Sequence, residues 1–60
     1  MSKITVGEKI KLLEDYMDIQ KGSVATIIYI DDFDQVTVSW LNGGQSSFSE
    51  EHLYKMFAVA

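Results

Sequence analysis

Apolar and polar residues alternate along several short runs of the chain, a period of two that is typical of strands with one buried face. The run EKIKLLED alternates isoleucine and leucine with lysine, and the run VTVSWL places two valines and Trp40 on one face. The run SVATIIYI is rich in β-branched residues, which favour strands. The pattern predicts five strands, within residues 8–15, 23–30, 36–41, 45–49 and 55–59.

Turn-forming residues separate these runs. Residues 16–22 read as a loop that ends at a glycine, and three aspartates between residues 31 and 34 favour a turn because their side chains bond nearby backbone. Asn42-Gly43 is a favoured type I′ hairpin pair, since both residues tolerate positive φ. Short strands joined by such turns predict a small all-β fold.

One helical turn is expected before the last strand. Ser49 is placed to act as its N-cap, and Glu50 and Glu51 would lie near the positive end of the helix. Sixty residues are too few for two cores, so we expect one domain over residues 1–60.

Trp40 is predicted to be a core residue because it shares strand parity with two valines. A barrel of this size has room for about a dozen core side chains. The predicted core consists of Ile4, Val6, Ile10, Leu12, Val24, Ile27, Ile30, Val36, Val38, Trp40, Phe48, Leu53 and Met56.

The net charge of −4 arises entirely from residues 22–60, and the chain has no arginine. Bidentate arginine contacts with phosphate or guanine are therefore excluded, and nucleic acid is not the expected partner. The chain has no cysteine for disulfides or thiolate metal sites, and no apolar run long enough for a membrane span or a signal peptide. These features predict a cytoplasmic protein without a membrane association.

Catalytic groups are sparse, so an enzyme is not expected. His52 is the only histidine, and Glu50, Glu51 and His52 are consecutive, which spreads them around a helical turn. The aspartates between residues 31 and 34 lack the glycine and distal glutamate of a helix–loop–helix calcium site. The sequence therefore predicts no cofactor, no metal and no catalytic residue.

The order of these motifs resembles SH3-like small barrels of the KOW and translation-protein type. It is most similar to an uncharacterised family of short bacterial and phage domains, with a match over about residues 6–57. The resemblance implies a five-stranded SH3-like small barrel with one short helical turn before the last strand, and a phage or mobile-element setting. Ala25 departs from the pattern, because the family has a glycine there. The matching positions are Gly7, Ile10, Leu12, Gly22, Ile27, Val36, Val38, Trp40, Asn42, Gly43, His52 and Leu53.

Several large apolar residues exceed what the small core can hold, and exposed aromatic and methionine clusters mark interaction surfaces. We expect a protein partner, with a basic surface, at the loop end of the barrel, and a module that regulates or decorates a larger assembly. Both the folding back of Phe33 onto the barrel and the packing of Tyr16 within its loop are open alternatives. The candidate partner-binding residues are Tyr16, Met17, Tyr29 and Phe33, with a rim of Asp31, Asp32 and Asp34.

The alternative is a KOW-like module that binds nucleic acid through a local lysine patch of Lys9, Lys11 and Lys21. The uncharged, β-prone run VATIIYI must be covered or paired, and a second copy is one way to do so. The chain is accordingly expected to be a monomer or a homodimer.

Overall fold

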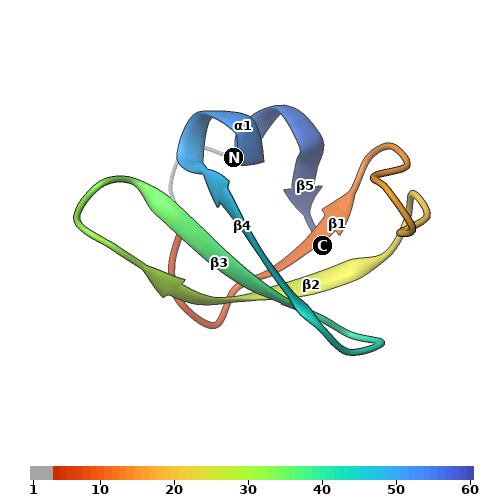
Figure 1. Cartoon of the computed structure of the whole chain (residues 1–60), viewed down its shortest axis with the longest axis horizontal. Helices are drawn as coiled ribbons and strands as arrows, with labels where there is room; N and C mark the ends of the chain where they lie inside the picture. Colours follow the sequence, from red (N-terminus) through yellow and green to blue (C-terminus); the bar gives the residue numbers. More distant parts are fainter. Residues whose placement is uncertain (1–3) are drawn as a thin grey trace.

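The computed structural model describes residues 4–60, and its elements follow the predicted order (Figure 1). They are β1 (Lys9–Leu12), β2 (Val24–Ile30), β3 (Gln35–Trp40), β4 (Gln45–Ser49), α1 (Glu50–Met56) and β5 (Phe57–Val59).

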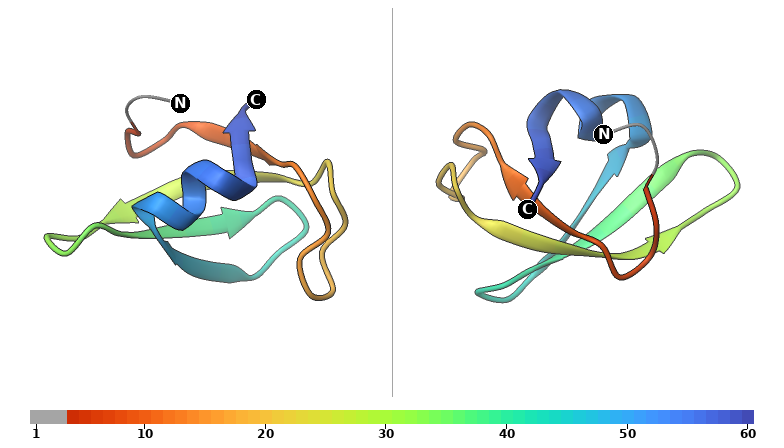
Figure 2. Two further views of the ribbon diagram at one scale, coloured as in Figure 1. Left: turned by 90° about the horizontal axis from the view of Figure 1, so that it is seen from above. Right: turned by 180° about the vertical axis from the view of Figure 1, so that it is seen from behind.

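The strands form one antiparallel sheet in the order β4-β3-β2-β1-β5. The first four strands each lie beside their neighbour in sequence, and only β5 crosses over to pair with β1. The sheet curls on itself, and α1 covers the side between β4 and β5 (Figures 1 and 2). The prediction of an all-β, five-stranded, barrel-like fold with a short helix before the last strand is confirmed.

The core follows the predicted parity in the first, third and fourth strands. Trp40 is only 4% exposed, and Ile10, Leu12, Val36 and Val38 are fully buried. The prediction that Trp40 is a core residue is confirmed. The full buried set is Ile10, Leu12, Ala25, Ile27, Val36, Val38, Trp40, Phe48, Leu53, Met56 and Phe57.

Two predicted core positions are wrong, and two core residues were missed. Val6 is 57% exposed because it lies in a turn, closed by a hydrogen bond from Glu8 N–H to the Thr5 carbonyl, rather than in β1. Val24 is half-buried on the outer face of the sheet, since its neighbour Ala25 points inward opposite Trp40. The Ala25 side chain is thus part of the core.

Phe57 is the second missed core residue. It caps the end of α1 and begins β5, so neither helical nor strand periodicity marks it. Its ring lies 5.7 Å from that of Trp40 and 5.5 Å from that of Phe48, between centroids. These three aromatic side chains pack against one another within the core.

A bulge interrupts β2 between Ile27 and Tyr29. The extra residue, Ile28, and Tyr29 are both exposed, so the inward–outward alternation restarts at Ile30, which is half-buried opposite Val36. Tyr29 lies opposite Thr37, on the outer face of the sheet.

The β3–β4 turn differs from the prediction. Positive φ occurs at Gly43 (105°) and Gly44 (88°) and not at Asn42. Gly43 N–H donates to the Trp40 carbonyl (2.9 Å), and Trp40 N–H donates to the Gly44 carbonyl (3.0 Å). The prediction of a type I′ turn at Asn42-Gly43 is wrong, because the turn is longer and places both glycines in the conformation that glycine favours.

Helix α1 begins as predicted and runs for seven residues rather than one turn. The His52 backbone N–H donates to Ser49 Oγ (3.2 Å), which confirms Ser49 as the N-cap. Glu51 and Lys55 form an exposed ion pair one turn apart, at 3.8 Å. The helix is therefore fixed to the end of β4, with Leu53 and Met56 turned into the core.

Candidate protein-interaction surfaces

The β2–β3 turn holds Phe33 in solvent. Asp31 Oδ1 accepts hydrogen bonds from the backbone N–H groups of Phe33 (2.8 Å) and Gln35 (3.0 Å), and Asp31 N–H donates to the Gln35 carbonyl (3.0 Å). Asp34 adopts a positive φ of 62°, which aspartate tolerates better than most residues. The Phe33 side chain is 84% exposed, so it does not fold back to cap the barrel.

The same turn is joined to the start of α1. Glu50 N–H donates to the Asp34 carbonyl (2.8 Å), which brings a turn and a helix that are distant in sequence into contact. Between them lies an open groove of about 570 Å³, lined by Asp34, Ser49, Glu50, Glu51 and Tyr54. We call this groove, together with Asp31, Asp32 and Phe33, the acidic end of the molecule.

Tyr54 is the only phenol in the acidic end, and its environment keeps it protonated. Its hydroxyl donates to Glu50 Oε1 (2.8 Å). That hydrogen bond raises the Tyr54 pKa above its ordinary value of 10.0, and partial burial and the negative charges of Glu50, Asp34 and Glu8 raise it further. Glu8 also has a buried oxygen, Oε1, without a hydrogen-bond partner among residues 4–60.

The β1–β2 connection holds Tyr16 and Met17 in different ways. Tyr16 is half-buried and meets Phe48 edge to face, with ring centroids 5.3 Å apart, so the loop-packing alternative applies to it. Tyr16 and Ile19 exchange two backbone hydrogen bonds of 2.8 Å, which leaves Met17 and Asp18 as a two-residue turn. Met17 has a positive φ of 52° and is 87% exposed.

The predicted cluster of exposed aromatic and methionine residues is divided by the fold. Met17 belongs to the β1–β2 connection and Phe33 to the β2–β3 turn, and these two loops lie at opposite ends of the molecule (Figure 1). Asp31, Asp32 and Asp34 surround Phe33 alone. Tyr29 is 60% exposed on the outer face of β2. A single loop end that carries Tyr16, Met17 and Phe33 is therefore not formed.

The lysines of the alternative hypothesis are exposed. Lys9 and Lys11 lie opposite Thr26 and Val24 on the outer face of β1. Lys21 lies in the β1–β2 connection, where its backbone N–H donates to Asp15 Oδ1 (2.8 Å). This connection also carries Glu14 and Asp18, so carboxylates accompany the patch.

Sequence reasoning missed the part of the acidic end that α1 contributes. Glu50 and Glu51 were assigned to the helix cap, and Tyr54 was given no role. The signal that connects them to Asp34 is a backbone hydrogen bond between segments distant in sequence, which periodicity cannot reveal.

Within residues 4–60, His, Asp and Glu side chains do not gather in a group of three or more that could hold a metal ion. The described part of the chain also has no helix with the length and apolar character needed to cross a bilayer. Comparison with protein-family models, curated proteins and solved structures finds no match to this chain. The resemblance to SH3-like and KOW-type domains therefore stays a prediction.

Proposed function

We propose that this protein is a small, non-enzymatic protein-interaction module whose acidic end binds a basic segment of a partner protein. The observation that carries the proposal is the position of Phe33, 84% exposed on a turn that Asp31 fixes with two hydrogen bonds. The proposed setting is the cytoplasm, where the module regulates or decorates a larger assembly.

An ordered turn makes Phe33 a suitable anchor. The backbone around it is already held by hydrogen bonds, so binding would lose little conformational entropy there. Aromatic side chains are enriched among residues that contribute most to binding. An exposed phenylalanine contributes little to the packing of its own fold, which leaves an interaction as its physical use.

The charges around Phe33 indicate the chemistry of the partner. Asp34, Glu50 and Glu51 line the groove beside the turn, and the Lys55 ammonium, which pairs with Glu51, compensates only part of their charge. A lysine or arginine side chain could enter this groove while an apolar neighbour covers Phe33. The carboxylates would repel phosphates and would increase the association rate with a basic surface more than the affinity.

The experiment is a capture assay from the native host with four forms of the full chain: the wild type, Phe33→Ser, Leu41→Ser and Glu51→Lys. Phe33→Ser should abolish capture of the partner, whereas Leu41→Ser should retain it. Leu41 is the matched control, since it is 81% exposed in the β3–β4 turn, away from the acidic end. Capture by the wild-type chain should weaken as salt is raised, and Glu51→Lys should capture the partner more weakly than the wild type does.

Equal loss of capture with Phe33→Ser and Leu41→Ser would contradict the proposal. Salt-sensitive binding of RNA or DNA that disappears with Lys9→Glu and Lys11→Glu would instead support the nucleic-acid alternative. A thermal melt of each variant checks that the fold is retained, which we expect because all of these side chains are exposed.

A further inference from the structure

Strand β4 forms one margin of the sheet. Among residues 4–60, β3 is the only strand that pairs with it. In the left view of Figure 2, β4 lies at the lower margin of the molecule, and the β1–β2 connection reaches down only beside the β3–β4 turn. The edge of β4 is therefore available for pairing with another strand.

The alternation of hydrogen bonds between β3 and β4 identifies the backbone groups of β4 that point away from the sheet. Gly44 and Glu50, on either side of β4, both bond toward β3: Gly44 accepts from Trp40, and Glu50 donates to Asp34. Bonded and non-bonded pairs alternate in an antiparallel ladder, so the backbone groups of Gln45, Ser47 and Ser49 face away from β3. Ser49 also starts α1, which engages its carbonyl but leaves its N–H directed outward.

The edge of β4 lacks the features that usually prevent an edge strand from pairing with another chain. Its sequence, QSSFS, has no charge, no proline and no bulge. The opposite edge, β5, has only three residues, and short edge strands resist pairing. Association through strand addition is therefore favoured at β4.

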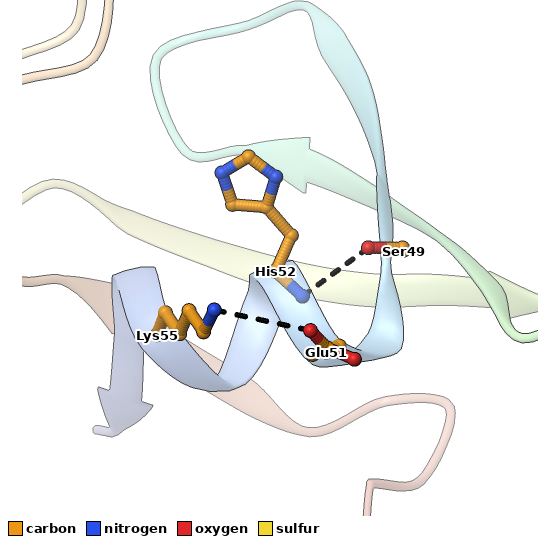
Figure 3. A network of polar contacts seen from close by, with 4 residues as sticks. All are labelled: Ser49, Glu51, His52 and Lys55. Carbon is orange, nitrogen blue, oxygen red and sulfur yellow. Dashed lines mark hydrogen bonds and ion pairs between the residues drawn. The ribbon is translucent and has the colours of Figure 1, made fainter.

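The two ends of β4 are complementary to each other. A groove of about 320 Å³ at the Gln45 end is lined in part by Met17 and Asp18 of the β1–β2 connection. At the Ser49 end, a second groove is lined by Ser49, Glu51, His52 and Lys55, and Figure 3 shows the His52 ring standing away from the Glu51–Lys55 ion pair. One end thus offers an exposed methionine and a carboxylate, and the other an aromatic ring and an ammonium group that is paired with Glu51.

We propose that two copies of this chain associate through β4, antiparallel, about a two-fold axis at Ser47. Two strands that run in opposite directions bring the Gln45 end of one copy to the Ser49 end of the other. Ser47 of each copy exchanges both backbone hydrogen bonds with Ser47 of the second copy, and the Ser49 N–H donates to the Gln45 carbonyl across the axis. The contact is isologous, so it closes as a dimer and cannot extend into a filament.

The complementary ends select a second copy over an unrelated strand. In this register Met17 of one copy reaches the His52 ring of the other, and His52 already meets Phe48 at a centroid distance of 6.1 Å. Asp18 of one copy approaches Lys55 of the other. The strand itself is uncharged, so no like charges face each other along the paired strands.

Substitutions at Ser47 test the pairing directly. The Ser47 side chain is exposed and, within residues 4–60, forms a hydrogen bond only with Thr37 Oγ1 (3.2 Å), a contact that Ser47→Ala removes without altering the edge backbone. In sedimentation experiments from about 1 µM to about 1 mM chain, the wild type and Ser47→Ala should dimerise with the same affinity. Ser47→Lys sets like charges opposite each other and should weaken dimerisation about tenfold or more. Ser47→Pro removes the outward N–H and should abolish dimerisation.

A charge exchange tests the register. Asp18→Lys and Lys55→Asp should each weaken the dimer by about two- to fivefold, and the double variant should recover affinity. Amide hydrogen exchange at Ser47 and Ser49 in the wild-type chain should slow as concentration rises, a readout that does not depend on any variant folding.

A wild-type chain that stays monomeric to about 1 mM would overturn the proposal, and so would a Ser47→Lys dimer as tight as the wild type. Failure of the charge exchange to recover affinity would overturn the register. A monomer whose β4 amides are protected only by an added extended peptide would show that a partner strand, not a second copy, occupies the edge. These results are independent of Phe33, which lies on another loop.

Discussion

Trp40 Nε1 donates a hydrogen bond of 2.9 Å to Ser46 Oγ on the neighbouring strand. The two side chains share the inner face of the sheet, so the indole is packed against Phe57 on one side and has its only polar atom satisfied on another. A large buried aromatic residue with a bonded N–H is a strong constraint on so small a core.

Truncation of Trp40 should unfold the chain. Loss of a buried tryptophan costs about 3–5 kcal/mol, and a core of this size supplies about 3–5 kcal/mol in total. We expect Trp40→Ala to lack a cooperative thermal transition above room temperature in circular dichroism. A melt close to that of the wild type would mean that Trp40 is not a core residue.

The Trp40–Ser46 bond should appear as an energetic coupling. Ser46→Ala leaves the indole N–H without its partner and should lower the free energy of unfolding by about 1 kcal/mol. In the Trp40→Phe background the same substitution should have almost no effect, since no N–H remains. Denaturant unfolding of the four forms measures the coupling, and equal effects of Ser46→Ala in both backgrounds would contradict it.

The β3–β4 turn should tolerate substitution at Asn42 better than at either glycine. Gly43→Ala and Gly44→Ala should each lower the free energy of unfolding by about 1 kcal/mol, because both residues have positive φ. A new Cβ at either position meets no atom of the described residues within 4 Å, so the expected loss is conformational and not steric. Asn42→Ala is the control and should have a much smaller effect in the same denaturant titration.

Met17 should be a position where glycine stabilises the fold. The side chain is almost fully exposed and its φ is positive, so Met17→Gly relieves strain and loses little packing. We expect an increase of up to about 1 kcal/mol in the free energy of unfolding, together with weaker dimerisation. Asp18→Gly, at a residue without positive φ, should not stabilise, and a destabilising Met17→Gly would show that Met17 supports its own loop.

Tyr54 should make stability fall at high pH. Its pKa is raised in the folded state above 10.0, so the folded chain holds the phenol proton more tightly than the unfolded chain does. The resulting stability is complete below pH 10.0 and is lost as pH rises through the folded-state pKa. Thermal melts should therefore show a smaller alkaline decline for Tyr54→Phe than for the wild type, and parallel declines would contradict the assignment.

The strands could be predicted because their signal is local. Alternation in VTVSWL and QSSFS places Trp40 and Phe48 inside, and the structure agrees. The predictions of buried positions fail where helical and strand periodicities meet and where a β-bulge adds one residue to a strand. Phe57 lies at the junction of helix and strand, and the bulge in β2 leaves Ile28 and Tyr29 exposed in succession.

The candidate site was less predictable because it depends on how the sheet curls. The acidic turn leaves open whether Phe33 is exposed or folds back, and the structure shows its side chain exposed. Its separation from Met17 follows from the placement of two loops at opposite ends of the molecule, and its proximity to α1 follows from the bond between Asp34 and Glu50. Such relationships arise from tertiary packing and leave no periodic trace in the sequence.

The pairing of β1 with β5 has a consequence for the order of folding. Hairpins join β1 through β4 in sequence, whereas β5 must close onto β1 from the far end of the chain, the contact with the largest loop-closure entropy. Whenever β5 detaches from β1, β1 becomes an unpaired edge strand. Lys9 and Lys11 lie on the outer face of β1, and lysines on an edge strand hinder pairing with other chains. We therefore expect the two lysines to hinder pairing between partly opened molecules.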